Sequence, residues 1–556
     1  MRLLLFFISL LFLYMPSVAG QDAGGAVAEE QKQLIYFTDK ANTPFTLNQP
    51  QEFLSAKALE RRERRHIAVA ARDLPVNPAY VASLKALDVQ VWYTSRWFNA
   101  AVVECSDAKL QEIQRLPFVK SARALNRIAL PAKELRRKAM QDLEVLPAVA
   151  NVKAALAEGD YGPAFHQADM LGTPALHKAG FAGEGMTIAV LDAGFPSVET
   201  QDAFAHLFQN NQIKGTYDFV QKQRNAYVAD AHGTAVLSTM AAYAPGKMIG
   251  TAYAANYLLL RTEDAASEHN IEEINWLLAA EYADSAGADV LNSSLGYTTF
   301  DSPSVSYTYK DLDGNTTLVA KAADIAAATG MLVVVSAGNE GNKAWQYISS
   351  PADADSVLTV GAVDSLGVKA GFSSFGPTAD GQVKPDVVAL GQNVYVLSTN
   401  GNVVKSNGTS FSGPIMAGFA TCLWQANYSR TNMQLIQLLR QSGSNAASPD
   451  SAVGYGIPSY NRTLTALPQL PVKGTAYITN PVKEQAIVLA LGQDWWNKPI
   501  YIQILDTTGK LLYGQSIATA QKEQSLQLAP QQLKAGIYLC RLRAGNRVAT
   551  LRFVKL

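Results

Sequence analysis

The stretch Met186-Thr187-Ile188-Ala189-Val190-Leu191-Asp192-Ala193-Gly194 is a short apolar run that ends in a carboxylate and a glycine. Apart from its threonine, the run 186–191 is apolar throughout, which is typical of a strand covered on both faces in a parallel sheet. Residues 331–335 repeat the pattern. A carboxylate at the tip of such a strand is costly unless a partner offsets its charge. The stretch therefore predicts a buried strand of an α/β fold with a functional group at its end.

Outward from this strand, apolar runs and helical stretches alternate from about residue 165 to residue 465. This alternation predicts a doubly wound, mostly parallel sheet, in which ligands bind at the carboxyl ends of the strands. The expected helices are Gly233–Tyr243, Asn270–Ala286, Thr317–Thr329 and Ser410–Ala426.

Three further polar residues stand where such a binding edge is expected. His232 opens an alanine-rich helix, Ser410 follows Gly408-Thr409 at the start of another helix, and Asn339 follows the strand 331–335. Each residue taken singly is explained by an ordinary turn or helix start. Their occurrence together, each in the expected context, is much harder to obtain by chance.

Together with Asp192, these residues make a set suited to acyl transfer. A serine hydroxyl is a poor nucleophile at neutral pH and needs a neighbouring base, which histidine supplies because its pKa lies near neutrality. A buried carboxylate holds the imidazole in the productive tautomer. A side-chain amide and the N–H groups at a helix start donate hydrogen bonds to the oxyanion. We therefore expect one catalytic site made of Asp192, His232, Ser410 and Asn339.

The same residues carry a resemblance to a known family. Their order along the chain, aspartate then histidine then serine, is that of subtilisin. Four blocks resemble the signature motifs of the subtilase family: Val190-Leu191-Asp192-Ala193-Gly194, His232-Gly233-Thr234, Ser336-Ala337-Gly338-Asn339 and Gly408-Thr409-Ser410-Phe411-Ser412-Gly413-Pro414. The resemblance covers residues 165–465, and it implies a subtilisin-like fold and a serine endopeptidase that works through an acyl-enzyme intermediate.

The resemblance also implies a role for each residue. Asp192 would orient the base His232. Ser410 would attack the peptide carbonyl, and Asn339 would donate a hydrogen bond to the oxyanion. The expected substrate-binding residues, which pair with an extended peptide or wall the main specificity pocket, are Ser294, Leu295, Gly296, Ala337 and Gly338.

Two departures from the family pattern accompany these matches. Ala193 stands where threonine is usual, at a position that carries no proton chemistry. After the serine, Phe411-Ser412-Gly413 replaces the commoner Met-Ala-Thr. The second departure changes the packing beneath the nucleophile and leaves the nucleophile itself unaltered.

Length and composition bound the remaining possibilities. A chain of 556 residues predicts about three structural units. Its formal net charge of +0 shows no basic excess, so no nucleic-acid partner is expected. The three cysteines, Cys105, Cys422 and Cys540, lie far apart, which argues against a disulfide framework and against a zinc site.

The N-terminal segments predict export and latency. Residues 1–20 combine Arg2, an apolar run and small residues, as in a secretory signal peptide, and no later run is long and apolar enough for a transmembrane segment. Residues 21–130 form an expected α+β unit similar to the inhibitory propeptides of subtilases. Its charged run 60–65 is interpreted as a solvated helix face. Residues 131–164 are expected to be a linker and processing region, with the cut between about residues 131 and 161.

The C-terminal region changes character after a linker at residues 466–473. Short alternating strands over residues 474–556 predict a small β-sandwich. This region resembles the type A sorting domain of type IX secretion in the motifs Thr479-Asn480-Pro481-Val482 and Ala535-Gly536-Ile537-Tyr538. The resemblance implies that the type IX secretion machinery is a partner of this protein. A carbohydrate-binding sandwich stays open as the alternative, because fold alone does not decide function.

The expected protein is a secreted or cell-surface protease, exported through the periplasm as a zymogen, with protein or peptide substrates and its own propeptide as partners. No cofactor is required for the chemistry, and structural calcium is possible although no metal ligands are assigned. The loop 311–315 resembles the start of a calcium site, but no glutamate completes it, which favours an ordinary turn. Two other interpretations stay open. One is a catalytically silent adhesin on the same scaffold. The other is a serine-carboxyl peptidase, which uses a glutamate in place of the histidine, so the presence of His232 argues against it.

Overall fold

The computed structural model describes residues 31–128 and 156–466 and much of the C-terminal region, namely residues 476–478, 486–491, 495–506, 509–521, 523–527, 533–534, 536–545 and 547–555. The predicted signal peptide therefore lies outside the described residues. So do residues 131–155 of the predicted processing region and residues 467–473 of the predicted linker.

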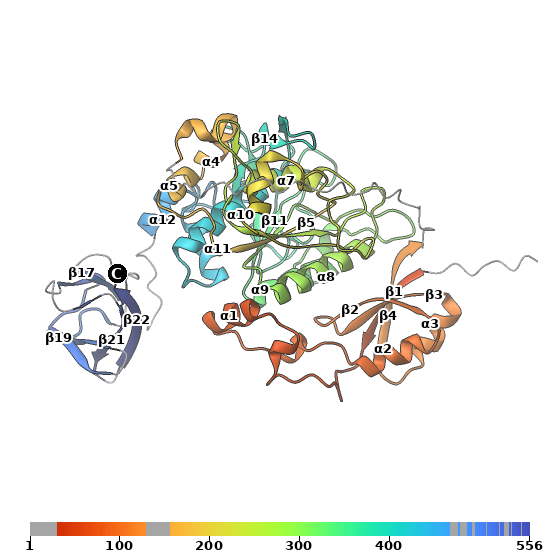
Figure 1. Ribbon diagram of the computed structural model, residues 1–556, viewed down its shortest axis with the longest axis horizontal. Coiled ribbons are helices and arrows are strands. Elements are labelled where there is room, and N and C mark those ends of the chain that lie inside the picture. Colours follow the sequence, from red (N-terminus) through yellow and green to blue (C-terminus); the bar gives the residue numbers. More distant parts are fainter. Residues whose placement is uncertain are drawn as a thin grey trace, which may run out of the picture.

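A seven-stranded sheet forms the centre of the middle unit (Figure 1), which we call the catalytic unit. All neighbouring strands in it are parallel, in the order β13-β12-β11-β10-β5-β9-β6. The prediction of a mostly parallel doubly wound sheet is confirmed. The strands are β5 (Thr187–Asp192), β6 (Ile213–Asp218), β9 (Asn256–Arg261), β10 (Val290–Ser293), β11 (Leu332–Ser336), β12 (Leu358–Val363) and β13 (Val387–Leu390).

Helices cover both faces of this sheet because alternate side chains of each strand point to opposite sides. In β5, Ile188 and Val190 belong to one core with α7 (His232–Ala241) and α10 (Thr409–Ala426). Ala189 and Leu191 belong to a second core with α8 (Ile271–Ala286) and α9 (Leu318–Ala328). The four helices expected from the sequence are thus present to within two residues of their predicted ends.

Shorter elements complete the catalytic unit. They are the 3₁₀ segment η3 (Glu158–Ala164), the helices α4 (Phe165–Asp169), α5 (Thr173–Lys178), α6 (Ala205–Gln209), α11 (Asn432–Gln441) and α12 (Tyr460–Ala466), and the hairpins β7 (Tyr243–Ala244) with β8 (Met248–Ile249) and β14 (Val394–Leu397) with β15 (Val403–Ser406).

The N-terminal unit is an antiparallel sheet of order β2-β3-β1-β4. Its elements are β1 (Gln31–Phe37), α1 (Ala56–Arg64), α2 (Pro78–Lys85), β2 (Gln90–Ser95), β3 (Ala100–Cys105), α3 (Asp107–Gln114) and β4 (Val119–Ile128). On one face of the sheet, Ile35 and Val103 pack with residues of α2 and α3. On the other face, Leu34 and Val102 join the core of α8 and α9. The N-terminal unit therefore shares a core with the catalytic unit.

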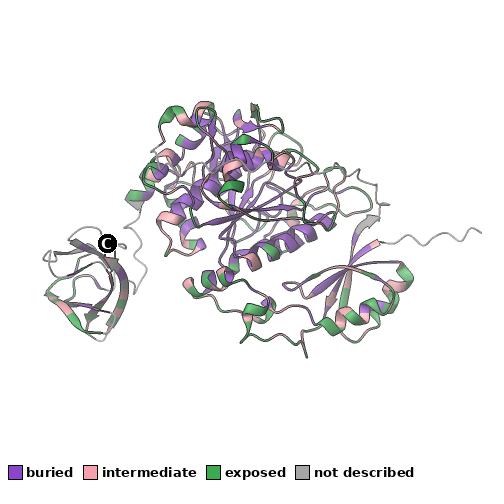
Figure 2. Ribbon diagram, in the orientation of Figure 1, coloured by how far each residue is buried: buried purple, intermediate pink, exposed green. Residues whose placement is uncertain are grey.

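Helix α8 lies between these two units. Figure 2 shows it buried along most of its length, and residues of both its faces are buried, among them Trp276, Glu281 and Asp284. Glu281 and Asp284 thus contact the N-terminal unit rather than water.

The charged run 60–65 does not form a solvated face, and that interpretation was wrong. Arg61 and Arg62 are each 1% exposed and Arg65 is 7% exposed, because α1 packs against the catalytic unit. Arg62 pairs with the nearby Asp73, but each of the three side chains also has a partner more than 200 residues further along the chain.

The C-terminal strands form two antiparallel sheets, β16-β17-β20 and β19-β18-β21-β22, which share one core that includes Ile487, Ile502 and Phe553. This arrangement agrees with the predicted β-sandwich. The strands are β16 (Ala476–Ile478), β17 (Ala486–Leu491), β18 (Ile500–Leu505), β19 (Leu511–Ile517), β20 (Glu523–Gln527), β21 (Gly536–Ala544) and β22 (Arg547–Lys555).

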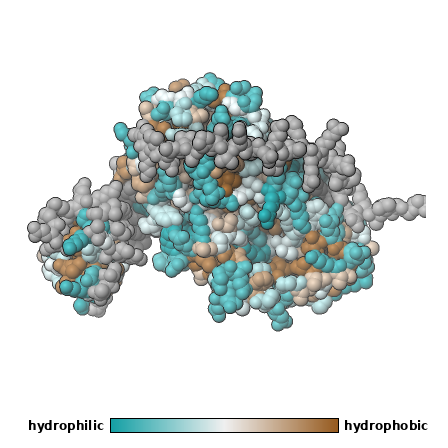
Figure 3. Space-filling view, viewed as in Figure 1, coloured by the Kyte–Doolittle hydropathy of each residue, from teal (hydrophilic) through white to brown (hydrophobic). Residues whose placement is uncertain are grey.

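The surface hydropathy and the state of the cysteines agree with what the sequence predicts. Hydrophilic residues cover much of the visible face of the catalytic unit, with separate hydrophobic patches among them (Figure 3). Among the described residues, no helix combines the length and the apolar character needed to cross a membrane. Cys105, Cys422 and Cys540 are buried and none of them forms a disulfide, in agreement with the expectation from their spacing.

Candidate active site

Asp192 and His232 form a hydrogen-bonded pair at the carboxyl end of β5. Asp192 is the last residue of the strand and is fully buried. Its Oδ1 lies 2.8 Å from His232 Nδ1 and also accepts a hydrogen bond of 2.8 Å from the N–H of Ala193. Its Oδ2 is buried without a hydrogen-bond partner among the described residues. Among side chains, the carboxylate therefore forms a hydrogen bond only with the imidazole in the part of the chain that the structure describes.

A glycine lets the two residues meet. His232 is the first residue of α7, and the next residue, Gly233, faces β5. A Cβ on Gly233 would lie 2.3 Å from the carbonyl oxygen of Gly194 and 2.9 Å from Cβ of Asp192. Because both atoms belong to packed structure, any side chain at this position would push α7 away from the strand. Glycine is thus required at position 233 because α7 and β5 approach each other closely there.

The environment of His232 favours its charged form. Burial of the imidazole disfavours the charge, but the charge and the hydrogen bond of Asp192 outweigh burial and raise the pKa of His232 above its ordinary value. A base held by a carboxylate in this way takes up a proton readily and keeps one ring tautomer.

Ser410 stands in the first turn of α10. The residue before the helix is Gly408, and Ser410 is the second helical residue, so its N–H has no partner within the helix. Ser410 Oγ lies 3.4 Å from the carbonyl oxygen of Ser294, to which it donates. The ring of Phe411 lies with its centroid 6.0 Å from that of His232, which brings the start of α10 beside the histidine.

Asn339 is held in one orientation by Thr409. Its side-chain oxygen Oδ1 accepts hydrogen bonds from the N–H of Thr409 at 2.9 Å and from its hydroxyl at 3.0 Å. The hydroxyl of Thr409 in turn accepts from the N–H of Gly338 at 3.2 Å. Because both bonds go to the amide oxygen, the Nδ2 group of Asn339 is the donor left for a ligand.

A hollow of about 130 Å³ lies beside Ser410 and Asn339. Its lining includes every expected substrate-binding residue except Ala337, and it is made by Ser294, Leu295, Gly296, Thr298, Ser336, Gly338, Asn339, Glu340, Ser349, Thr409 and Ser410. Ala337 is fully buried in the core and its carbonyl oxygen accepts the N–H of Ser349 at 3.1 Å. It supports the hollow from behind rather than lining it.

Ser349 is a residue of the hollow that sequence reasoning missed. Its hydroxyl is buried and has no hydrogen-bond partner among the described residues. A Cβ built on Gly296 would lie 2.0 Å from this hydroxyl, and one on Gly338 would lie 3.0 Å from it. Ser349 thus lies between the two glycine segments, where only the folded chain brings it.

Thr409 is the second residue that was missed in this role. In the sequence it was only part of a turn before Ser410, and nothing there indicates a contact with Asn339, which is 70 positions away. A threonine directly before the expected nucleophile was the signal available.

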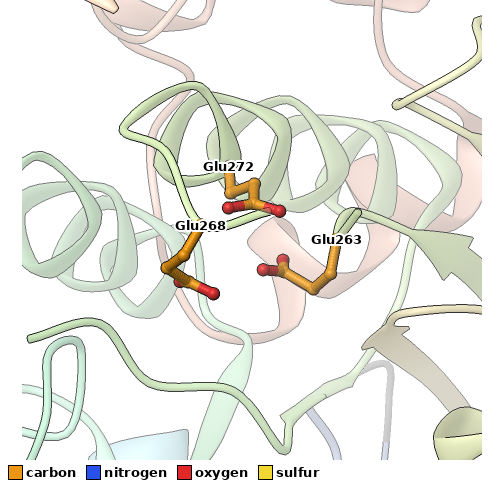
Figure 4. Close-up of side chains that lie close together, drawn as sticks. All are labelled: Glu263, Glu268 and Glu272. Carbon is orange, nitrogen blue, oxygen red and sulfur yellow. The ribbon is translucent and has the colours of Figure 1, made fainter. Parts of the chain in front are cut away.

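Three carboxylates at the start of α8 could hold a cation. Glu263, Glu268 and Glu272 point toward one another (Figure 4), with one oxygen of each within 4.8 Å of the others. Burial, together with the charge of Glu272, raises the pKa of Glu263 well above its usual range, and burial raises the pKa of Glu268 to about 7. Oxygen donors of this kind suit calcium.

The loop 311–315 is held together by its own hydrogen bonds. Both carboxylate oxygens of Asp313 are used by its own turn: Oδ1 accepts from the N–H groups of Asn315 and Thr316, and Oδ2 from the hydroxyl of Thr316. This is the ordinary turn that the sequence favoured.

Comparison with known protein families divides the chain into three matches. The model described as "Subtilase family" matches residues 183–456. The model described as "Peptidase S8 propeptide domain, Bacteroidota" matches residues 32–151. The model described as "Secretion system C-terminal sorting domain" matches residues 479–556. The three resemblances inferred from the sequence are confirmed.

Individual relatives agree with these matches. The chain is 27% identical to Subtilisin NAT of Bacillus subtilis subsp. natto over 352 residues, which cover 62% of this chain and 84% of that protein. It is 30% identical to Subtilisin Savinase of Lederbergia lenta over 276 residues, which cover 50% of this chain and 89% of that protein.

Proposed function

The chain belongs to the subtilase family and is a subtilisin-like serine endopeptidase, and we propose that its peptide-bond hydrolysis uses Asp192, His232 and Ser410. Ser410 is the nucleophile, His232 is the general base and then the general acid, and Asp192 orients the imidazole. The first product leaves while the other remains as an ester on Ser410, and water then releases it.

The starting position of the serine supports this assignment. Its hydroxyl donates to the carbonyl oxygen of Ser294, and the imidazole lies beside the same turn of α10. For the imidazole to take the proton, the Ser410 hydroxyl would have to turn about the Cα–Cβ bond from that carbonyl toward His232 when a substrate binds. Catalytic hydrogen bonds commonly tighten only once the substrate is bound.

The oxyanion would be held by two donors. One is Nδ2 of Asn339, whose oxygen end is occupied by Thr409. The other is the N–H of Ser410 in the first turn of α10, where the helix dipole adds to the attraction for negative charge.

The substrate chain would pair with the segment Ser294–Gly296. This segment follows β10 and is not itself part of a strand, so its backbone is available to an extended peptide. The side chain next to the cut bond would enter the hollow toward Ser349.

The observation that carries the proposal is the 2.8 Å contact between His232 Nδ1 and the buried carboxylate of Asp192, at the edge of the sheet where α10 begins. The carboxylate of Asp192 is fully removed from water. Its Oδ2 has no hydrogen-bond partner among the described residues, so its strongest interaction is the one that Oδ1 makes with the histidine.

The flanking matches make this a secreted zymogen protease, exported or displayed at the cell surface, with its own propeptide and the sorting machinery as partners. We propose that removal of residues 474–556 leaves the protease in the periplasm. Normal release of the truncated chain, measured by immunoblotting of the culture medium, would refute that role of the tail.

Labelling with a fluorophosphonate probe tests the catalytic assignment. After processing, the wild-type enzyme should carry the probe on Ser410, and Ser410→Ala should not react. Processed wild-type protein that takes up no probe, while its circular dichroism is that of folded protein, would support the adhesin alternative instead.

A further inference from the structure

Charge is divided unevenly among the units of the chain. Residues 156–466, the catalytic unit, contain 15 lysines and arginines against 28 aspartates and glutamates, which is a formal net charge of −13. Residues 474–556 contain 10 against 4, and residues 21–155 contain 20 against 15. The neutral chain therefore consists of a strongly acidic catalytic unit between two basic regions. An excess of this size creates a potential that attracts cationic molecules and repels anionic ones.

A substrate chain paired with Ser294–Gly296 would extend from the cut bond toward Tyr297. The Ser410 hydroxyl lies 3.4 Å from the carbonyl oxygen of Ser294, which places the cut bond beside Ser294. A paired strand advances about 3.3 Å per residue, so about the third to fifth substrate residue from the cut lies beside Tyr297 and its neighbours. The groups around Tyr297 therefore determine which side chains are favoured at these substrate positions.

Tyr297 connects this end of the groove to a carboxylate. Its side chain is 1% exposed, and its hydroxyl donates to Oε1 of Glu263 at 2.8 Å. Glu263 follows β9, the strand that pairs with β5, and the N–H of Thr262 donates to the carbonyl oxygen of Asp192 at 3.0 Å. Glu263 therefore lies at the same edge of the sheet as Asp192, next to the segment that would pair with the substrate.

Glu268 lies beside Glu263 and is partly exposed (Figure 4). Its own N–H donates to Oδ2 of Asp301 at 2.9 Å. Burial and the like charges of Asp301 and Glu273 raise the pKa of Glu268 to about 7. At pH 8 the ionised carboxylate of Glu268 is thus surrounded by charges of its own sign. A cationic substrate side chain beside it would relieve this repulsion.

Two further carboxylates border the groove from other segments. Asp230 is exposed and accepts the N–H of His232 at 2.8 Å. Glu340 lines the hollow beside Ser410 and pairs at 2.9 Å with Lys343, whose side chain is 60% exposed. So exposed a pair contributes little and competes weakly with a substrate. Because a cleft bordered by one sign of charge concentrates the electric field, the groove is where the charge of the catalytic unit acts most strongly on a substrate.

We propose that the protease selects cationic peptides, and that Glu268, together with the negative field of the catalytic unit, favours lysine or arginine at about the third to fifth residue from the cut bond, on the side of Gly296. Acidic peptides are disfavoured by the same charges. The inference rests on the proposed function, which supplies the groove and the cut bond.

The test uses the processed enzyme and three quenched fluorescent peptides of one parent sequence, each cleaved at a single bond that mass spectrometry verifies. They carry three lysines, three glutamines or three glutamates at the third to fifth positions from that bond. We measure kcat/KM at pH 8 in about 20 mM and about 0.5 M salt, which shortens the screening length from about 20 Å to about 4 Å.

Two variants locate the source of the selectivity. Glu268→Gln removes the carboxylate nearest the expected path of the substrate. Glu184→Gln is the matched control, because Glu184 is exposed and precedes β5, at the end of the sheet opposite Asp192. Both variants remove one negative charge from the catalytic unit, so a difference between them reports position rather than net charge.

At low salt we expect kcat/KM for the lysine peptide to exceed that for the glutamate peptide at least about tenfold, with the glutamine peptide between them. The three values should converge to within about threefold at high salt. Glu268→Gln should lower the ratio of the lysine to the glutamine peptide about threefold, and Glu184→Gln should leave this ratio unchanged.

Equal cleavage of the lysine and glutamate peptides at low salt would overturn the proposal, and so would equal effects of the two variants. The proposed function is checked separately with the glutamine peptide. If the fluorophosphonate probe does not stop cleavage of that peptide, the assignment of Ser410 fails, whatever the ratio between the charged peptides.

Discussion

The Nδ1 atom of His232 lies 2.8 Å from Oδ1 of Asp192, although the two residues are 40 positions apart in the chain. The strand β5 ends at the aspartate and the helix α7 begins at the histidine, so the parallel sheet brings them together at one edge. The contact combines a buried carboxylate with a half-exposed ring. It determines the tautomer and the pKa that we expect for His232.

Asp192→Asn should lower kcat by about 10⁴-fold, with little change in KM, because the amide supports the wrong tautomer of His232. Hydrolysis of a chromogenic peptide by the processed enzyme measures this. The matched control is Asp230→Asn: Asp230 accepts the backbone N–H of His232 at 2.8 Å and its charge adds to the raised pKa of His232, but it forms no hydrogen bond with the ring, so its loss should cost no more than a few-fold. Equal losses for both variants would show that the carboxylate of Asp192 has no special role.

The pH profile should show the raised pKa of His232. Only the neutral imidazole acts as a base, and its folded-state pKa lies above the ordinary 6.5. The acid limb of kcat/KM should therefore bend at a pH above 6.5 as the pH is lowered, and activity should be complete only on the alkaline side of that value. A limb centred at or below 6.5 would contradict the assigned balance between burial and Asp192.

Thr409→Val should lower kcat about tenfold and leave KM nearly unchanged, because it removes one of the two hydrogen bonds that orient the Asn339 amide. Asn339→Ala removes the donor itself and should cost about 10²–10³ in kcat. Thr409→Ser retains the hydroxyl and should recover most of the activity. If Thr409→Val and Thr409→Ser behave alike, the hydroxyl does not act through Asn339.

Glu268→Gln should raise the Tm of the Ser410→Ala chain at pH 8 and leave it unchanged at pH 4. Burial and the charges of Asp301 and Glu273 raise the folded-state pKa of Glu268 to about 7, above its unfolded value near 4.5. The folded state therefore binds the proton more tightly, so stability is greatest below pH 4.5 and falls as the pH rises toward 7.

A chelator present throughout this experiment prevents a bound cation from masking the repulsion among the three glutamates. Glu112→Gln is the control, because Glu112 is exposed and paired with Lys109. A Tm for Glu268→Gln that does not differ at pH 8 from that of the Ser410→Ala parent would show that the charge of Glu268 is already compensated in the folded state.

The mature N-terminus should lie between residues 131 and 157. Segment η3 belongs to the catalytic unit: Tyr161 is 1% exposed and its hydroxyl lies 2.7 Å from His177 Nδ1, while the carbonyl oxygen of Asp160 accepts the N–H of Gly246 at 2.8 Å. A cut within these contacts would remove packed structure. N-terminal sequencing of the secreted enzyme decides this, and a start before residue 131 or beyond residue 157 would refute it.

The sheet, its main helices and the expected catalytic residues could be predicted from the sequence because each marks the end of an element. Asp192 ends an apolar run, while His232 and Ser410 begin helices, and those patterns are local. The orientation of Asn339 by Thr409 and the position of Ser349 could not be predicted, since they depend on loops that meet only after folding.

The arginine run failed as a prediction for a related physical reason. Alternating Arg and Glu residues are normally solvated, and a local pattern contains no information about a distant acceptor. Arg61 is buried because the ends of α8 and α9, 227 and 268 residues away, offer carbonyl groups and a carboxylate. These distant acceptors offset the free energy of burying the charge of Arg61, and the local sequence around Arg61 contains no sign of them.

The most direct test of the central claim is to trap the acyl-enzyme. The processed enzyme is mixed with a peptide p-nitrophenyl ester, quenched in acid during the burst of p-nitrophenol, digested and examined by mass spectrometry. The account predicts one acyl group per molecule, carried on Ser410 within residues 407–414, and its absence in Ser410→Ala. A burst with the acyl group on another residue, or turnover that persists in Ser410→Ala, would contradict the account.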